Sequence, residues 1–202
     1  MGVYSNPTPV QIGHGCRFLG DQWKIVGRMV LGVVEDGETY YWHEFHMKSP
    51  DEGEAYLEYE EDEGTISWII HLMYKPMTPH SQSQLSALKP GDYLDIDGKQ
   101  YRVKLRDRST VHHIEGEAPE GVSVGYTVDY VDLEGHGMSY VAEWTPNCVE
   151  YMKGTHLSEP EVIRLFGLEE EFRKAKSGST LKYVLIGLLA AGILVGLYFA
   201  LK

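Results

Sequence analysis

Runs of alternating apolar and polar residues, separated by glycine-containing turns, recur about every 8–12 residues across residues 13–157. Successive side chains of a strand point to opposite faces, so each run presents one apolar face that must be buried. The clearest run is residues 93–103, in which Asp97-Gly98 can supply the two positive φ angles of a tight hairpin turn. This repeated pattern predicts a mainly β domain.

Glycine-containing turns are expected at residues 35–38, 60–64 and 134–137. The fold class that follows is an antiparallel meander or two small β lobes, barrel-like or sandwich-like. Two prolines and a polar cluster make residues 75–88 the candidate boundary between two lobes. Besides the hairpin, strands are predicted at residues 23–29, 39–47, 55–60, 65–73, 111–115, 122–132 and 139–143.

A short helix is predicted after the β domain. Ser158 and Glu161 have the spacing of a capping box, and the proline between them is tolerated in the first helical turn. An apolar stripe continues the pattern, although Gly167 interrupts it. We therefore expect a helix over residues 158–176, followed by a hinge at residues 177–182.

Residues 183–201 form an uncharged, apolar stretch bounded by Lys182 and Lys202. As a helix it would extend about 28 Å, close to the ~30 Å hydrocarbon core of a bilayer. A buried core helix, the alternative, is usually shorter and keeps a polar face. We therefore expect one C-terminal transmembrane helix, a juxtamembrane helix over residues 158–176, and an N-terminal tail over residues 1–12.

Basic residues gather before this stretch: Arg173, Lys174, Lys176 and Lys182 precede it, and only Lys202 follows. Lysine and arginine near a membrane span stay on the cytoplasmic side. The expected localisation is therefore the cell inner membrane, with a single pass and the folded domain in the cytoplasm. The lipid bilayer is the first expected partner.

Within the apolar stretch, Gly192, Gly196 and Ala200 place small residues four apart on one helical face. Such a face lets two helix backbones approach closely, so a homodimer through this helix is one expectation. The alternative is that glycine is simply common in membrane helices, and then the spacing carries no function.

The chain is acidic, with 30 Asp and Glu against 18 Lys and Arg and a formal net charge of −12. Phosphate backbones need a basic field, so nucleic acid is not an expected partner. An acidic surface rich in tyrosine would instead attract cations. Two cysteines, Cys16 and Cys148, are too few for a disulfide framework and indicate a reducing compartment.

The nine histidines do not form a recognisable metal motif. His43 and His46 are three apart on a predicted strand, where they would point to opposite faces. His112 and His113 are adjacent and would be separated for the same reason. We therefore expect neither a metal nor another cofactor.

Three glutamates, Glu44, Glu117 and Glu143, lie within strand patterns instead of turns. Glu44 follows Trp42 and Glu143 precedes Trp144, and burial beside aromatic rings can raise the pKa of a carboxyl enough for general acid catalysis. The alternative is that each carboxylate accepts hydrogen bonds from backbone N–H groups or tyrosine hydroxyls. These three residues are the candidate catalytic residues of a hydrolase or lyase.

Several blocks of the chain occur in an order that resembles the bacterial family catalogued as domain of unknown function 4178, over roughly residues 13–157. The blocks include Leu19-Gly20-Asp21, Tyr41-Trp42-His43-Glu44-Phe45, Asp97-Gly98-Lys99-Gln100-Tyr101, Ile114-Glu115-Gly116-Glu117, Tyr140-Val141-Ala142-Glu143-Trp144 and Val149-Glu150-Tyr151-Met152-Lys153-Gly154. The resemblance implies a β-rich domain without an established activity. It also implies that Trp42, Gly116 and Gly154 match motif positions, without assigning a binding role to any of them.

The expected function is that of a non-enzymatic binding or adaptor module, a cytoplasmic β domain tethered to the inner membrane that binds a protein partner or a small cation. The alternative is a carboxylate-dependent hydrolase or lyase using Glu44, Glu117 or Glu143. That alternative requires at least two of these carboxylates to converge with a histidine in one pocket.

Overall fold

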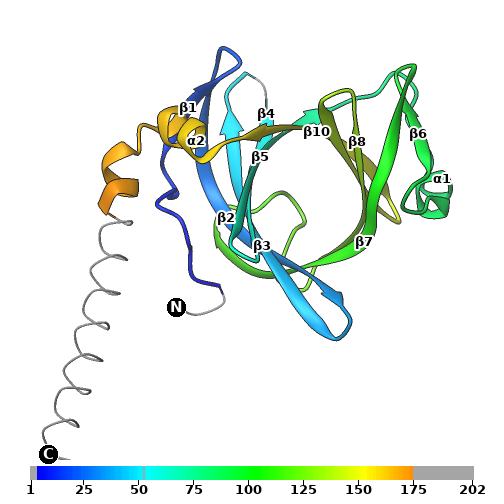
Figure 1. Ribbon diagram of the computed structural model, residues 1–202, viewed down its shortest axis with the longest axis horizontal. Coiled ribbons are helices and arrows are strands. Elements are labelled where there is room, and N and C mark those ends of the chain that lie inside the picture. The colour runs from blue at the N-terminus through cyan, green and yellow to red at the C-terminus, as the bar shows by residue number, and fades with distance from the viewer. Residues whose placement is uncertain (1–3, 52, 175–202) are drawn as a thin grey trace, which may run out of the picture.

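The structure, a computed structural model, describes residues 4–51 and 53–174. Within them, ten strands form one antiparallel sheet, and eight of these strands close into a barrel because β2 pairs with both β3 and β7 (Figure 1). The mainly β prediction is confirmed. The elements are β1 (Gly15–Phe18), β2 (Asp21–Glu35), β3 (Glu38–Ser49), β4 (Gly53–Asp62), β5 (Thr65–Tyr74), α1 (Gln82–Ala87), β6 (Tyr93–Ile96), β7 (Lys99–Gly116), β8 (Thr127–Gly135), β9 (Met138–Thr145), β10 (Cys148–Leu157) and α2 (Glu159–Phe166).

The barrel contains β2, β3, β4, β5, β10, β9, β8 and β7, in that order around the wall. β1 and β6 extend the sheet beyond the two strands that close the barrel. The predicted boundary at residues 75–88 does not divide the sheet, because β5 continues directly into pairing with β10. The chain therefore builds one barrel and not two lobes.

Tight turns with two positive φ angles connect the predicted hairpins. At the turn of the 93–103 hairpin, φ is 52° at Asp97 and 81° at Gly98. The predicted turn at residues 35–38 has the same form, with φ of 51° at Asp36 and 86° at Gly37. Such turns match the right-handed twist of the strands they join, which explains why the glycine pattern predicted these hairpins correctly.

The barrel closes where two glycines face each other, since Gly27 of β2 pairs with Gly116 of β7. A Cβ atom at Gly27 would overlap the backbone of Glu117, and one at Gly116 would lie 2.5 Å from the carbonyl oxygen of Val26. Gly116 also has a φ of +70°, which side-chain-bearing residues rarely adopt. The motif residue Gly116 therefore has a structural role in bringing the first and last barrel strands together.

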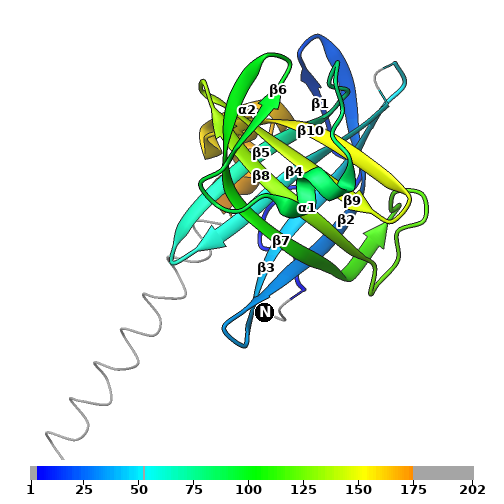
Figure 2. The same ribbon diagram turned by 90° about the vertical axis from the view of Figure 1, so that its right-hand side faces the viewer.

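Two hydrophobic cores lie against the outside of the barrel, one under α2 and the other under α1 and β6. Figure 1 shows these elements on opposite sides of the barrel. One core covers the outer faces of β2 to β5, and α2 packs onto it through Val162 and Phe166. The other covers β7 to β10, and α1 and β6 pack onto it through Leu85, Leu94 and Ile96. In Figure 2 the side of the barrel that carries α1 and β6 faces the viewer. The outer faces of the strands are thus the buried apolar faces.

The predicted capping box is present at the start of α2, with Ser158 as N-cap and Glu161 at the third position. Gly167 takes the left-handed conformation and ends α2, and the chain is helical again over residues 169–174, so Gly167 divides the helix predicted over residues 158–176. The predicted apolar stripe is buried, because Val162, Phe166 and Phe172 all join the core on the barrel wall.

Other strand boundaries differ from the prediction. β8 begins at Thr127 and not at residue 122, since Gly121 and Gly125 have positive φ angles that interrupt an extended chain. β10, which was not predicted as a strand, completes the barrel wall between β5 and β9.

Among the described residues, no helix is long and apolar enough to cross a membrane. The predicted hinge at residues 177–182, the apolar stretch at residues 183–201 and its packing residues Gly192, Gly196 and Ala200 lie outside the described residues.

Candidate functional site

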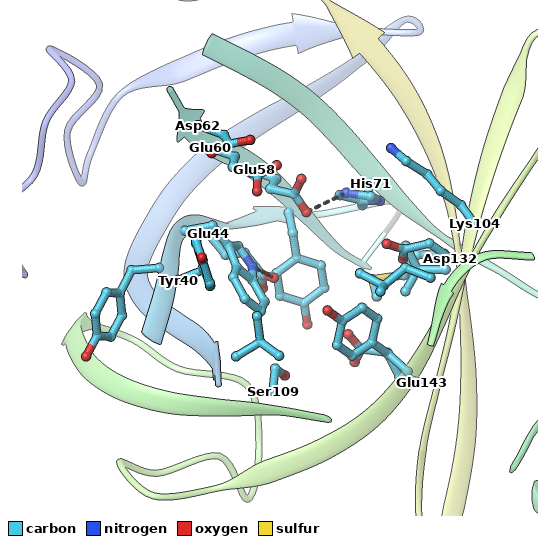
Figure 3. A pocket seen from close by; sticks show the side chains of 18 of the residues that line it. Tyr40, Glu44, Glu58, Glu60, Asp62, His71, Lys104, Ser109, Asp132 and Glu143 are labelled. Carbon is cyan, nitrogen blue, oxygen red and sulfur yellow. Dashed lines mark hydrogen bonds and ion pairs between the residues drawn. The ribbon is translucent and has the colours of Figure 1, made fainter. Parts of the chain in front are cut away.

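Much of the barrel interior is polar, because most apolar side chains of its strands point outward into the two cores. The alternate positions point inward, where they surround a cavity of about 640 Å³. Figure 3 shows carboxylates from four strands directed into this cavity. They are Glu44 of β3, Glu58 of β4, Asp132 of β8 and Glu143 of β9.

Three of these carboxylic acids hold their protons unusually tightly. Burial, with a smaller contribution from the charge of Glu58, raises the pKa of Glu44 to about 7. The same two causes raise the pKa of Asp132 to about 7. Burial followed by the charge of Glu44 raises the pKa of Glu143 to about 8. Near neutral pH the interior therefore carries a partly protonated set of carboxyl groups.

Aromatic rings separate the carboxylates. The indole Nε1 of Trp42 donates a hydrogen bond of 2.9 Å to Glu44, and the Trp42 ring packs edge-on against Tyr130 at a centroid distance of 6.4 Å. Tyr56 also lines the cavity. The cavity thus combines negative charge with the faces and edges of aromatic rings.

His71 of β5 pairs with one of the four carboxylates. Its Nε2 lies 3.2 Å from Glu58 Oε2, and the ring is only 4% exposed. Burial lowers the pKa of His71, but the hydrogen bond and charge of Glu58 outweigh it and leave that pKa above its ordinary value. Its buried Nδ1 has no hydrogen-bond partner among the described residues.

The absence of a side chain at Gly154 leaves space for the His71 ring beside the barrel wall. A Cβ atom at Gly154 would lie 3.4 Å from His71 Cε1 and would overlap the hydroxyl of Ser139. The motif residue Gly154 therefore leaves room for a histidine and a serine at this point of the interior.

The rim of the cavity is also acidic. Glu60, Glu61, Asp62 and Glu63, from the end of β4 and the turn that follows, line it together with the exposed Lys104 of β7. Burial, then the charges of Glu58 and Asp62, raises the pKa of Glu60. A positively charged molecule would be attracted to this opening.

The carboxylates do not cluster at one point. Within the described residues, no group of three or more His, Cys, Asp or Glu side chains converges as metal ligands would. The negative charges are instead distributed around the wall, with rings between them. Such an arrangement suits a molecule with a delocalised or apolar body better than a compact ion.

The structure brings together some of the residues singled out in the sequence and separates others. Trp42, Glu44 and Glu143 meet in the cavity, and Gly154 lies beside it. Glu117 lies on the outer surface, where it accepts a 2.9 Å hydrogen bond from Lys48 Nζ and plays no part in the cavity.

Sequence reasoning missed Glu58, His71 and Asp132. All three lie on strands that were predicted, at positions that alternate with outward-facing apolar residues. The alternation could have indicated that each of these side chains lies on the face opposite the apolar one. It could not show that the three converge, because that depends on which strands are neighbours in the closed barrel.

Comparison with known proteins adds the family. No curated protein matches the chain, and no solved structure matches it. The model of one family, described as a domain of unknown function (DUF4178), matches residues 11–159, which include every strand of the barrel. The chain therefore belongs to the DUF4178 family.

Proposed function

We propose that the barrel is a binding module for an organic cation. The observation that carries this proposal is the set of four carboxylates, Glu44, Glu58, Asp132 and Glu143, that surround one cavity with aromatic rings between them. An ammonium group among them would receive charge compensation from several directions, and its carbon body would contact the rings. The expected partner is thus the small cation, and an adaptor role toward another protein stays a prediction.

The size of the cavity supports a small-molecule ligand. Pockets for such ligands usually measure about 300–1,000 Å³, and eight-stranded barrels are just wide enough to hold one. The cavity, at about 640 Å³, lies within this range. The unpartnered Nδ1 of the buried His71 is a further group that a ligand could satisfy.

Calorimetric titration of the full chain with n-butylamine, in nonionic detergent at pH 8, tests the proposal. We expect saturable binding to the wild type and loss of that binding in the Glu44→Gln, Glu143→Gln double variant. Glu117→Gln serves as the matched control, since it removes a carboxylate from the outer surface. Absence of binding to the wild type, or equal binding by the double variant, would refute the proposal.

Acid–base catalysis is the second candidate function. Glu44 and Glu143 converge with His71 in one pocket, as a carboxylate-dependent hydrolase or lyase would need. Their raised pKa values lie near neutral pH, where one carboxyl could donate a proton and the other accept one. A new product in NMR spectra of a bound amine after long incubation would favour catalysis, because a binding module forms no product.

We further propose that residues 183–201 tether this barrel to the inner membrane, with the barrel in the cytoplasm. The uncharged stretch and the basic residues before it support this proposal. α2 is held on the barrel wall, so the tether would begin close to the barrel surface. Removing the residues after Ser179 should move the protein from the membrane fraction to the supernatant, and an unchanged distribution would refute the tether.

A homodimer through Gly192, Gly196 and Ala200 stays part of this proposal. Replacing Gly196 with Leu should abolish cross-linking between two copies in membranes, because a large side chain keeps the helices apart. Equal cross-linking would exclude this face as the contact.

A further inference from the structure

A second cavity, of about 310 Å³, shares part of its lining with the first. Glu44, Tyr56, Glu143 and Met152 line both cavities, so these four side chains form the boundary between them. A molecule bound among the carboxylates of the larger cavity would therefore have the smaller cavity directly beside it.

Part of the wall of the smaller cavity is apolar, although five glutamates, Glu44, Glu54, Glu120, Glu143 and Glu150, line it as well. Met29, Leu31 and Val111, each no more than 5% exposed, form a hydrophobic cluster inside the barrel, and Val122 and Tyr126 pack against it. This is the one cluster of buried apolar residues among the described residues that the interior contains, since the other two lie outside the wall.

The segment between β7 and β8 covers this end of the barrel. Its residues Pro119, Val122 and Tyr126 line the smaller cavity. Backbone hydrogen bonds attach it to β7, with Gly125 N–H donating to the Val111 carbonyl at 2.8 Å and Val111 N–H donating to the Tyr126 carbonyl at 2.9 Å. The covering segment is thus fixed to the wall that it shields.

We infer that the ligand of the barrel is an amine with an unbranched apolar tail, its ammonium group near Glu44 and Glu143 and its tail in the smaller cavity against Leu31 and Val111. This inference rests on the proposed function and names the class of cation. Burial of a tail there removes apolar surface from water, whereas a compact ammonium ion would leave this cavity unused.

The main alternative ligand is a diamine, which carries a second positive charge at the far end of its tail. Glu54, Glu120 and Glu150 lie at the outer edge of the smaller cavity and could attract it. Beside Met29, Leu31 and Val111, however, a charge would lose its water without gaining a partner. This apolar part of the wall therefore favours an uncharged tail.

A series of amines from methylamine to n-hexylamine, titrated into the full chain in nonionic detergent with a detergent blank, tests the inference. Affinity should rise about fourfold for each added methylene until the smaller cavity is filled, the gain expected for removing one methylene from water. Val111→Phe should flatten this dependence on chain length, because the larger ring occupies the space of the tail. If that variant fails to fold, Val122→Phe on the covering segment tests the same point.

Val34→Phe is the matched control, since Val34 is exposed on the outer surface, and it should keep the wild-type dependence. Equal affinity for methylamine and n-hexylamine would overturn the inference and leave the proposed function standing. Tighter binding of 1,6-diaminohexane than of n-hexylamine would also overturn it, by showing that the far end takes a charge. If no amine in the series binds, the proposed function itself fails.

Discussion

At the scale of single residues, position relative to the barrel wall decides what a glutamate does. Glu143 faces the cavity, and burial followed by the charge of Glu44 raises its pKa to about 8. Glu117 faces outward, and the hydrogen bond and charge of Lys48 lower its pKa. Both stand within strand-like patterns in the sequence, so their residue type and neighbours along the chain did not separate them.

Glu143→Gln should stabilise the protein at alkaline pH. A carboxyl whose pKa is raised in the folded state contributes stability below its unfolded pKa, and that contribution disappears as pH rises through about 8. The variant should therefore gain on the order of 2 kcal/mol in free energy of unfolding at pH 9 and little at pH 5, since water in the open cavity screens part of the effect. Urea unfolding at the two pH values measures this.

Glu117→Gln is the control. It should lower the free energy of unfolding at both pH values, whereas Glu143→Gln should raise it at pH 9. The pKa of Glu117 is lowered in the folded state, so the stability it adds is present above its unfolded pKa and is lost as pH falls through the folded value. The raised pKa of Glu143 would be contradicted by two results together. The wild type would be more stable at pH 9 than at pH 5, and Glu143→Gln would not increase the free energy of unfolding at pH 9.

Trp42→Phe should make Glu44 a weaker acid. The indole N–H donates to Glu44 at 2.9 Å and favours the ionised carboxylate, so its removal should raise the proton affinity of Glu44 roughly tenfold. Carboxyl chemical shifts recorded by NMR during a pH titration report this change. Trp68→Phe, in the outer core, should leave the Glu44 titration as it is in the wild type.

At the scale of elements, the pairing of β2 with β7 closes the sheet into a barrel with an interior cavity. This pairing needs Gly27 opposite Gly116, where the two backbones approach too closely for a side chain. Without it the inward-facing residues of β3 and β9 would lie on an open sheet, and Glu44 and Glu143 would not share a cavity.

Gly27→Ala should lower the free energy of unfolding by about 3 kcal/mol, because the added Cβ overlaps the backbone of Glu117 and forces the strands apart. Thermal or urea unfolding measures the loss. Gly98→Asn provides the control, since Gly98 sits in an open turn with a φ of +81° that asparagine tolerates. A loss no larger than that of the control would show that the barrel does not depend on this close approach.

The sequence predicted the elements better than their arrangement. Alternation with glycine turns correctly predicted antiparallel strands and the 93–103 hairpin, because both follow from local backbone geometry. It did not reveal which face of each strand points inward, since either face can be buried once helices and edge strands cover the outside. Glu58 and His71 lie 13 residues apart yet pair in space, and only the register of β4 with β5 places them together.

At the scale of the whole molecule, the barrel reverses the usual arrangement of a small β-barrel. Its two cores lie outside the wall, and its interior holds carboxylates, rings and cavities. The stability of the fold therefore depends on α1, α2 and the edge strands, whereas the interior is available to a ligand. Because the outer cores stabilise the fold, the barrel can hold buried carboxylates in its interior even though they destabilise it.

Binding of an amine should release protons near neutral pH. The carboxyl groups of Glu44, Asp132 and Glu143 have pKa values of about 7 to 8, and a nearby ammonium ion lowers them by favouring the ionised forms. Titrations at pH 7 in two buffers of different ionisation enthalpy should therefore give different apparent heats. Identical heats would mean that the cation binds away from these groups.

The central claim is that the cation occupies the interior of the barrel. The most direct measurement is a set of NMR nuclear Overhauser contacts between bound n-butylamine and assigned protons of the full chain. The account predicts contacts from the methylene protons to the ring protons of Tyr56, which lines both cavities of the interior. Contacts confined to outward-facing residues, such as Trp68 or Phe166 of the outer core, would contradict it.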